Sequence, residues 1–300
     1  MKRIVYFLVL FVFLSCSKND ISFERAKISV RGQEIEILTA YKIFDNYLLN
    51  KKDYFRSVYQ NIEREFIENA EYPFLLETIK REIKPDQRLK EATSLLKQCD
   101  ILNIVDSSFQ KIIKELPGPK TKILIIPANP EYRAFYKQYK VGVAAITVGA
   151  GKIIVSIDPT SNYWEVQLPY VLAHEYHHSV WTSRNFTTVD FTPLEYLVLE
   201  GKADSFAKNL FPNIDMPHTK MIDENKERLV WDLIKPELNN RKSEMNDLMM
   251  IGNEDIPACS GYTIGFNIVE LYKRNNQNVH DSLIIDIEPE QILFLSKYDE

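Results

Sequence analysis

The spacing of apolar residues divides the chain into two parts. Between residues 35 and 116 apolar positions recur every three to four residues, a periodicity typical of amphipathic helices. Helices are predicted at Ile35–Leu49, Asp53–Asn69, Phe74–Ile83, Asp86–Gln98 and Asn103–Leu116. The sequence Leu116-Pro117-Gly118-Pro119 breaks this pattern, so we predict a domain boundary between residues 116 and 117.

After this boundary the pattern favours strands. Lys122–Ile126, Val143–Val148 and Lys152–Ile157 are rich in β-branched residues, and a short glycine-containing link joins the last two. This predicts a hairpin directly before the next helix. An edge strand at that place could hold an extended peptide by backbone pairing, or it could simply cover the helix.

Helical patterns return in the C-terminal half. Thr192-Pro193-Leu194-Glu195 is a capping box with proline at the first helical position, which predicts a helix to about Leu210. Further helices are predicted at Glu224–Ile234, Tyr262–Tyr272 and Pro289–Lys297. The expected fold class is therefore α+β and mostly helical, with a helical N-terminal region (16–116) before the second domain (117–300).

Composition narrows the class of protein. The chain has 300 residues, 45% hydrophobic and 26% charged residues, which is ordinary for a globular protein. Its formal net charge is -5. A nucleic-acid binder normally has a basic surface, so we expect no nucleic-acid partner.

The N-terminus has the features of a bacterial export signal. Lys2 and Arg3 precede the apolar run Ile4–Leu14, which is too short to span a bilayer. Leu14-Ser15-Cys16 then resembles a lipoprotein cleavage site, which predicts a signal peptide over residues 1–15, lipidated Cys16 and a short polar tether. The alternative is ordinary cleavage nearby, with Cys16 an incidental thiol. Lipidation would place the protein in the cell envelope, outside the cytoplasm and anchored to a membrane.

Two cysteines remain after such processing. Cys99 and Cys259 could pair in an oxidising compartment, or they could be two small buried side chains. Sequence alone does not decide between these alternatives, because it does not give their separation.

The segment 171–181 carries the strongest chemical signal. It reads VLAHEYHHSVW and contains HExxH on a predicted helix. Residues four apart lie on one helix face, so His174 and His178 can direct imidazole nitrogens at one metal ion. Glu175 lies about 100° further round, where it can face a water on that ion. Two imidazoles and a nearby carboxylate predict the core of a zinc hydrolase.

A zinc ion that keeps one position open for water needs a third protein ligand. The candidates are Glu195 and Glu200, which lie about 140° apart on the next helix. Glu195 already completes the capping box. Glu200 can bind the metal if Asp204, one turn later, accepts the Nδ1 proton of a histidine ligand. Gly201 keeps this turn slim and should let the two helices approach closely.

HExxH followed by ExxxD on the next helix resembles the gluzincin arrangement of thermolysin-like metallopeptidases. The segments AHEYHHSVW, LEYLVLEGKADSFA and SGYTIGFNIVELY are similar to an uncharacterised bacterial family of predicted zinc-dependent proteases. The resemblance covers about residues 117–300. It implies a thermolysin-like zincin core, in which a small sheet precedes the HExxH helix and the ExxxD helix.

Such hydrolysis also needs a hydrogen-bond donor for the oxyanion. Tyr262 lies between Gly261 and Gly265, which permit close packing against the active-site helices, and it is our candidate; its alternative role is core packing. His218 is a lesser candidate. His177 lies off the ligand face, and His280 is expected at the surface.

These patterns together predict a membrane-anchored zinc metallopeptidase that acts on a peptide or protein substrate, with Glu175 as general base. The alternative is a non-catalytic zinc-binding lipoprotein with a chaperone or scaffold role.

Overall fold

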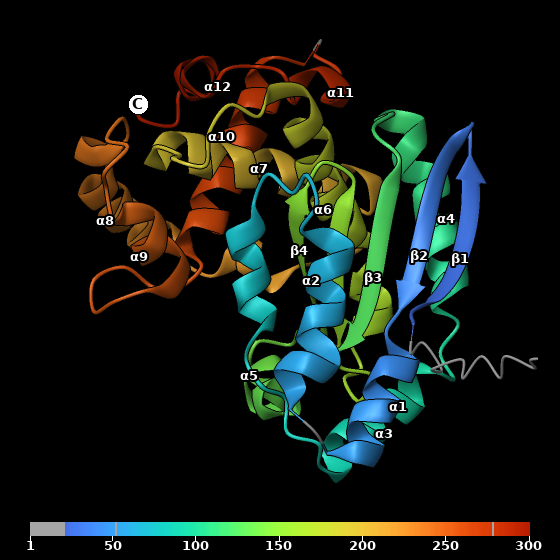
Figure 1. Cartoon of the computed structure of the whole chain (residues 1–300). Helices are drawn as coiled ribbons and strands as arrows, with labels where there is room; N and C mark the ends of the chain where they lie inside the picture. Colours follow the sequence, from blue (N-terminus) through green and yellow to red (C-terminus); the bar gives the residue numbers. More distant parts are fainter. Residues whose placement is uncertain (1–21, 52, 278) are drawn as a thin grey trace, which may run out of the picture.

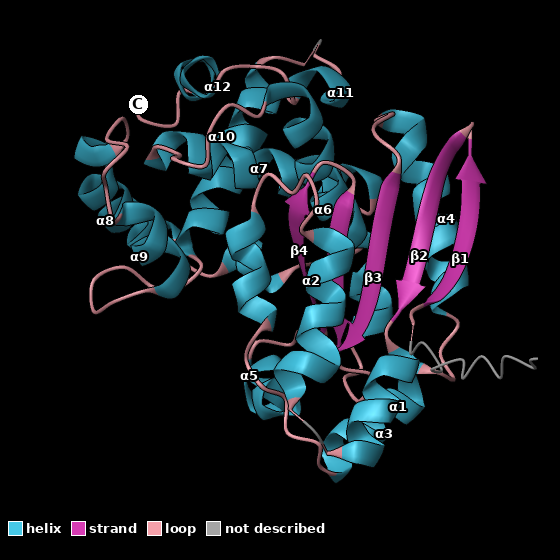
Figure 2. Ribbon diagram, in the orientation of Figure 1, coloured by secondary structure: helices cyan, strands magenta, loops and turns pink. Residues whose placement is uncertain are grey.

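A mixed five-stranded sheet forms the centre of the molecule, with helices on both faces (Figures 1 and 2). The computed structural model describes residues 22–51, 53–277 and 279–300. The strand order is β1-β2-β3-β5-β4. Strands β2, β3 and β5 are parallel, and the edge strands β1 and β4 pair antiparallel with their neighbours. The strands are β1 (Glu24–Val30), β2 (Gln33–Thr39), β3 (Thr121–Pro127), β4 (Val143–Gly149) and β5 (Lys152–Ile157).

The predicted hairpin is confirmed as β4 and β5. A bulge interrupts their register between Thr147 and Gly149, at the end of the edge strand. Gly151, in the turn, has a φ of 70°, a backbone conformation that glycine adopts without steric cost. A Cβ there would also lie 2.2 Å from the carbonyl oxygen of Lys120, so this turn requires glycine.

The prediction of a single helix over Ile35–Leu49 is wrong in its first part, because Gln33–Thr39 is strand β2 and a helix begins only at Tyr41. Ile35 and Ile37 alternate with glutamates, and both isoleucines are buried on one sheet face. The N-terminal region is therefore not helical throughout. Strands from both sides of the boundary at 116/117 share the sheet.

One face of the sheet is covered by α4 (Ile101–Glu115) and α6 (Trp164–Asn185), which lie behind it in Figure 1. The other face is covered by short helices of the N-terminal region. These are α1 (Tyr41–Asn50), the π-helix η1 (Phe55–Tyr59), α2 (Gln60–Phe66), the 3₁₀ helix η2 (Pro73–Ile79) and α3 (Gln87–Leu96).

The C-terminal helices form a third hydrophobic cluster beside the sheet, at the side of β4 (Figure 1). They are α7 (Pro193–Leu210), α8 (Glu224–Ile234), α9 (Met245–Ile251), α10 (Ser260–Asn275), α11 (Asp281–Ile284) and α12 (Pro289–Ser296). Helix α7 begins with the predicted capping box, in which Thr192 and Glu195 satisfy each other's backbone N–H groups.

The observed architecture confirms an α+β, predominantly helical fold with a small sheet. The sequence pattern did not predict α9, α11 or the short helices at Pro130–Tyr132 (η3), Arg133–Gln138 (α5), Pro217–Lys220 (η4) and Lys235–Glu237 (η5). They have too few residues to establish a helical period.

Within the described residues, no helix combines the length and hydrophobicity that crossing a bilayer requires. The predicted signal peptide and Cys16 lie outside the described residues. Strand β1 begins at Glu24, so the predicted tether cannot extend beyond residue 23.

Candidate metal centre

The HExxH segment lies in the middle of α6, buried between the sheet and α7. His174 and Glu175 are 8% and 7% exposed, although both are polar. Helix α7 crosses α6 and directs Glu200 at the same point, with 12% of that side chain exposed. Buried polar groups are costly unless they have partners, so the contacts of these three side chains decide what the site can hold.

Three ligand atoms converge there. His174 Nε2 lies 3.0 Å from His178 Nε2, and Glu200 Oε2 lies 3.2 Å from the first nitrogen and 3.3 Å from the second. Zinc bound tetrahedrally at its usual bond lengths holds its ligand atoms about 3.3 Å apart. Glu200 Oε2 is buried and accepts no hydrogen bond from the described residues. Both the spacing and this unpartnered oxygen fit a zinc ion.

Asp204 orients His174. Its Oδ1 lies 3.0 Å from His174 Nδ1, which directs the Nδ1 proton at the carboxylate and makes Nε2 the nitrogen available to a metal ion. The same oxygen accepts hydrogen bonds from the Tyr170 hydroxyl at 3.0 Å and from His218 Nε2 at 2.9 Å. Asp204 is fully buried. The three donors satisfy an oxygen that water does not reach.

The charges in this cluster shift each other's pKa values. Burial raises the pKa of Glu200, but His178 and His174 outweigh it and bring the pKa to about 2. Burial likewise opposes ionisation of Asp204, yet His218 and His174 hold its pKa well below the ordinary range. Burial lowers the pKa of His174, and Asp204 and Glu200 reverse this and raise it well above its usual value. Without metal, the site favours two carboxylates and a protonated His174.

Glu175 is oriented by the edge strand rather than by the other site residues. Its Oε2 accepts a hydrogen bond of 2.7 Å from the hydroxyl of Thr147 on β4, and its backbone oxygen accepts from the same hydroxyl at 2.8 Å. The carboxylate lines the cavities beside the metal centre, together with His174 and Tyr262. It therefore lies outside the ligand cluster and lines both cavities.

Tyr262, near the start of α10, lies beside two histidines of the site. Its ring centroid lies 5.0 Å from that of His218 and 6.4 Å from that of His174. The charge of Glu200 and burial raise the pKa of the phenol well above its usual value, so it stays protonated and can donate a hydrogen bond.

Two glycines set the distance between α7 and α10. A Cβ on Gly201 would lie 2.1 Å from the carbonyl oxygen of Gly265, and a Cβ on Gly265 would lie 2.1 Å from that of Leu197. The predicted close approach at Gly201 is thus directed at α10, not at α6. The prediction that Gly265 lets α10 pack against an active-site helix is confirmed.

Two cavities flank the centre. One, of about 270 Å³, lies towards α5 and the start of β4 and includes Tyr139, Val143 and Met216 in its wall. The other, of about 340 Å³, includes Phe74 and Trp181. Both are lined mainly by apolar side chains, and both reach His174, Glu175 and Tyr262. His174, Glu175 and Tyr262 therefore lie where these two mainly apolar cavities meet.

The remaining predicted residues lie apart from this cluster. His177 is 2% exposed and packs against Phe206, and burial holds its pKa well below the usual value, so it is not directed at the ligand atoms. His280 is exposed, as predicted, and caps α11. Cys99 and Cys259 are free thiols of intermediate burial.

Two partners of the site, Tyr170 and Thr147, were not predicted from the sequence, and a third, His218, has another contact than the predicted one. Tyr170 precedes His174 by one helical turn, a spacing that could have indicated a shared partner. His218, considered as an oxyanion donor, instead bonds Asp204. The bond from Thr147 to Glu175 joins a strand to a helix, and no local spacing predicts such a pair.

Comparison with known proteins identifies the class. Residues 101–294 match the family described as "Predicted Zn-dependent protease (DUF2268)", and the chain belongs to this family. The match begins in α4, so it extends further towards the N-terminus than the resemblance in the sequence suggested.

A relative is known from Bacillus subtilis (strain 168), "Uncharacterized protein YjfC". It is 27% identical over 206 residues, which are 61% of this chain and 66% of that protein. The match thus spans slightly less than two thirds of the relative's length. No solved structure matches the chain.

Proposed function

We propose that the protein is a zinc metallopeptidase of the gluzincin type, with a thermolysin-like core and peptide or protein substrates. The observation that carries the proposal is the convergence of His174 Nε2, His178 Nε2 and Glu200 Oε2 within 3.3 Å of one another. The family description points the same way. Zinc bound there would polarise a substrate carbonyl and lower the pKa of a water towards about 7.

The protein's own side chains divide the remaining work. Glu175, oriented by Thr147, takes the proton from the attacking water and passes it to the leaving amine. The protonated phenol of Tyr262 donates a hydrogen bond to the developing oxyanion. Asp204 keeps the Nδ1 proton on His174, so that Nε2 is free to bind metal.

We infer that the substrate lies extended along the outer edge of β4. A backbone bond from outside the sheet reaches this strand near its end, from the N–H of Tyr72 to the oxygen of Val148 at 3.1 Å. The earlier part, around Ala144–Ile146, is partly exposed, and no backbone bond from outside the sheet joins it among the described residues. An extended peptide can pair with such an edge, directly beside Glu175.

A peptide-library digest of the full-length protein, with and without chelator, tests the reaction. We expect cleavage that chelator removes and zinc restores. Replacing Glu175 with Gln should leave zinc content unchanged and lower kcat/KM by about 10²–10⁴-fold, because only the general base is lost. Glu165→Gln, an exposed change on the same helix, is the matched control and should cleave like wild type.

Cleavage by the Glu175 variant at the wild-type rate would refute the assignment of Glu175 as general base. Bound zinc without cleavage would favour the scaffold alternative.

We also propose that the protein is a lipoprotein of the cell envelope, anchored to a membrane through Cys16. The support is the basic and apolar N-terminal sequence that ends in Leu14-Ser15-Cys16. Mass spectrometry of the mature N-terminus should find an acylated cysteine. Cys16→Ser should move the protein out of the membrane fraction, and an unmodified N-terminus in wild type would contradict the anchor.

A further inference from the structure

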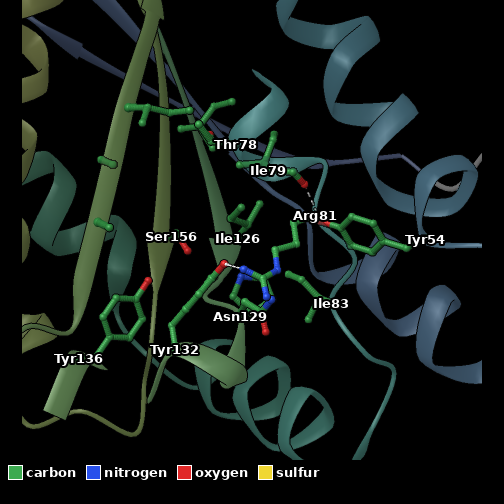
Figure 3. A pocket seen from close by; sticks show the side chains of 15 residues that line it. Tyr54, Thr78, Ile79, Arg81, Ile83, Ile126, Asn129, Tyr132, Tyr136 and Ser156 are labelled. Carbon is green, nitrogen blue, oxygen red and sulfur yellow. Dashed lines mark hydrogen bonds between the residues drawn. The ribbon is translucent and has the colours of Figure 1, made fainter. Parts of the chain in front are cut away.

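A third cavity lies on the opposite face of the sheet from α6, and the proposed peptidase mechanism does not use it. It has a volume of about 260 Å³. Its floor consists of Ile126, Ile154 and Ser156 from β3 and β5, and its walls come from the N-terminal region and α5 (Figure 3). Figure 3 shows Tyr136 and Ser156 on one side of it and Tyr54 on the other.

This cavity meets the two cavities of the metal centre at β4. Ala145 lines all three spaces. Tyr136 lines this cavity and the space towards α5, and Ile146 lines this cavity and the space beside Phe74. The three spaces therefore adjoin one another around the edge strand that we propose as the substrate's pairing partner.

An extended chain directs successive side chains to opposite faces of the sheet that it joins. Side chains on one face of a peptide paired with β4 would enter the spaces beside His174 and Glu175. The side chains between them would point to the other face, where the third cavity lies. We propose that this cavity is a specificity subsite for an aromatic side chain of the substrate, and this inference rests on the proposed peptidase function.

The size and chemistry of the cavity favour an aromatic ring. Its volume exceeds the ~150 Å³ of an engineered protein cavity that holds benzene. Tyr54, Tyr132 and Tyr136 line it with three rings, which an aromatic side chain can contact. Isoleucines supply the floor. A side chain of alanine size would leave most of this space unfilled.

Arg81 adds a cationic group to the same space. Its Nη1 donates a hydrogen bond of 2.6 Å to the hydroxyl of Tyr132, and its guanidinium lies 5.3 Å from the centre of that ring (Figure 3). The nearest carboxylate contact is loose, at 4.0 Å from Glu131, which pairs with Lys84 at 2.8 Å. A guanidinium that is held in place but not closely neutralised can interact with the face of an incoming ring.

The test compares cleavage profiles of the full-length protein on a peptide library. Wild type should prefer Phe, Tyr or Trp at one substrate position. Ser156→Leu fills the cavity and should lower kcat/KM for those peptides about 10-fold or more, while peptides with Ala at that position change less than about 2-fold. Ser94→Leu adds the same side chain on an exposed part of α3 and should leave the profile unchanged. Thermal unfolding checks that both variants are folded.

A second variant keeps the test independent of packing in the sheet. Arg81→Ala should lower the aromatic preference about two- to five-fold. Arg56→Ala removes an arginine whose side chain is 81% exposed and does not line the cavity, so it should have no effect. An unchanged aromatic preference in both Ser156→Leu and Arg81→Ala overturns the subsite, as does a wild-type profile without an aromatic preference.

Binding separates failure of the subsite from failure of the peptidase. Fluorescence anisotropy of labelled library peptides is measured with zinc-loaded Glu175→Gln protein. If wild type cleaves nothing but this variant binds aromatic peptides, and Ser156→Leu weakens that binding, the subsite stands and the peptidase reaction is refuted. If wild type cleaves and the profiles of all variants agree, only the subsite is refuted. If the wild type cleaves no peptide and the Glu175→Gln variant binds none, both the subsite and the peptidase reaction are refuted.

Discussion

The two faces of the sheet differ in what they bury. The face towards the N-terminal helices buries apolar side chains around Leu124 and Ile154, with phenol hydroxyls bonded to backbone carbonyls, as from Tyr47 to Ile83. The face towards α6 also has an apolar core, but next to it lie His174, Glu175 and Asp204. Among the described residues before 117, no charged side chain is buried.

This difference means that residues of the apolar core and residues of the candidate metal centre contribute to different properties of the protein. Burial of a polar group costs about 1–3 kcal/mol when it lacks a partner, and more for a charge. Such groups are tolerated where hydrogen bonds or a bound ion replace their lost contacts with water. Among its described residues, the first face buries no charged group that needs a partner, whereas on the second the proposed metal ion would satisfy Glu200 and the two histidines. We therefore expect changes in the apolar core of the first face to alter stability, and changes at the candidate metal centre on the second face to alter metal binding.

The largest expected effect is the loss of the metal site. His178→Ala removes one of the three proposed ligands, and we expect it to lose stoichiometric zinc and all zinc-dependent cleavage, because two ligands bind the ion far more weakly than three. Metal analysis of the purified protein measures this. His280→Ala, at an exposed histidine, is the control and should retain zinc. If the His178 variant retained zinc, this histidine would not be a metal ligand, and the proposed difference between the two faces would be wrong.

The next effect belongs to the apolar face. Leu124 is fully buried there, and Leu124→Ala should lower the free energy of unfolding by about 2–5 kcal/mol through lost burial and a new cavity. Denaturant titration of the metal-free protein gives this value. Zinc affinity under native conditions should stay within about two-fold. Val166→Ala on α6, where the side chain is 61% exposed, should change stability by less than about 0.5 kcal/mol.

A smaller effect is expected one layer away from the metal. Asp204→Asn keeps the size of the side chain but removes the charge that orients His174, and it should weaken zinc binding about 10–100-fold. Competition with a zinc chelator of known affinity measures the change. Asp215→Asn, at a side chain that is 71% exposed, should leave the affinity unchanged. An unchanged affinity in the Asp204 variant would mean that Tyr170 and His218, not the metal ligand, need this carboxylate.

The smallest effect concerns an ion pair on the apolar side. Burial raises the pKa of Glu65, but Arg25 and Lys122 outweigh it and hold the pKa below its ordinary value of 4.5. The pair therefore stabilises the fold above pH 4.5, and this contribution disappears as the pH falls through the lower folded-state value. Glu65→Gln should cost up to about 1 kcal/mol at neutral pH and less in acid. Urea titrations at several pH values test this, with Glu68→Gln as the exposed control.

Much of the α6 side could be predicted from sequence, because its signals are local. The HExxH spacing, the capping box of α7 and the turn at Gly151 each depend on a few neighbouring residues. The capping box occupies Glu195, which favours Glu200 as the ligand, and Glu195 indeed bonds the backbone of Thr192 and pairs with Arg241.

The rest depends on contacts between distant segments. Strand β2 was mistaken for the start of a helix because the apolar residues around Ile35 also fit a helical period, and only pairing with β3, more than eighty residues later, decides between them. Thr147 likewise meets Glu175 only through the packing of β4 on α6, and His218 meets Asp204 only because the chain folds back beside α7. No periodicity in one segment contains that information.

The touching backbones at Gly201 and Gly265 limit how this centre can change during evolution. Most helix pairs adjust their separation when a side chain between them is exchanged for a larger or smaller one. Here no side chain intervenes, so the offset between Glu200 and Tyr262 cannot drift gradually through substitutions at this crossing. New substrate preferences are therefore more accessible through the walls of the cavities than through the spacing of the reactive groups.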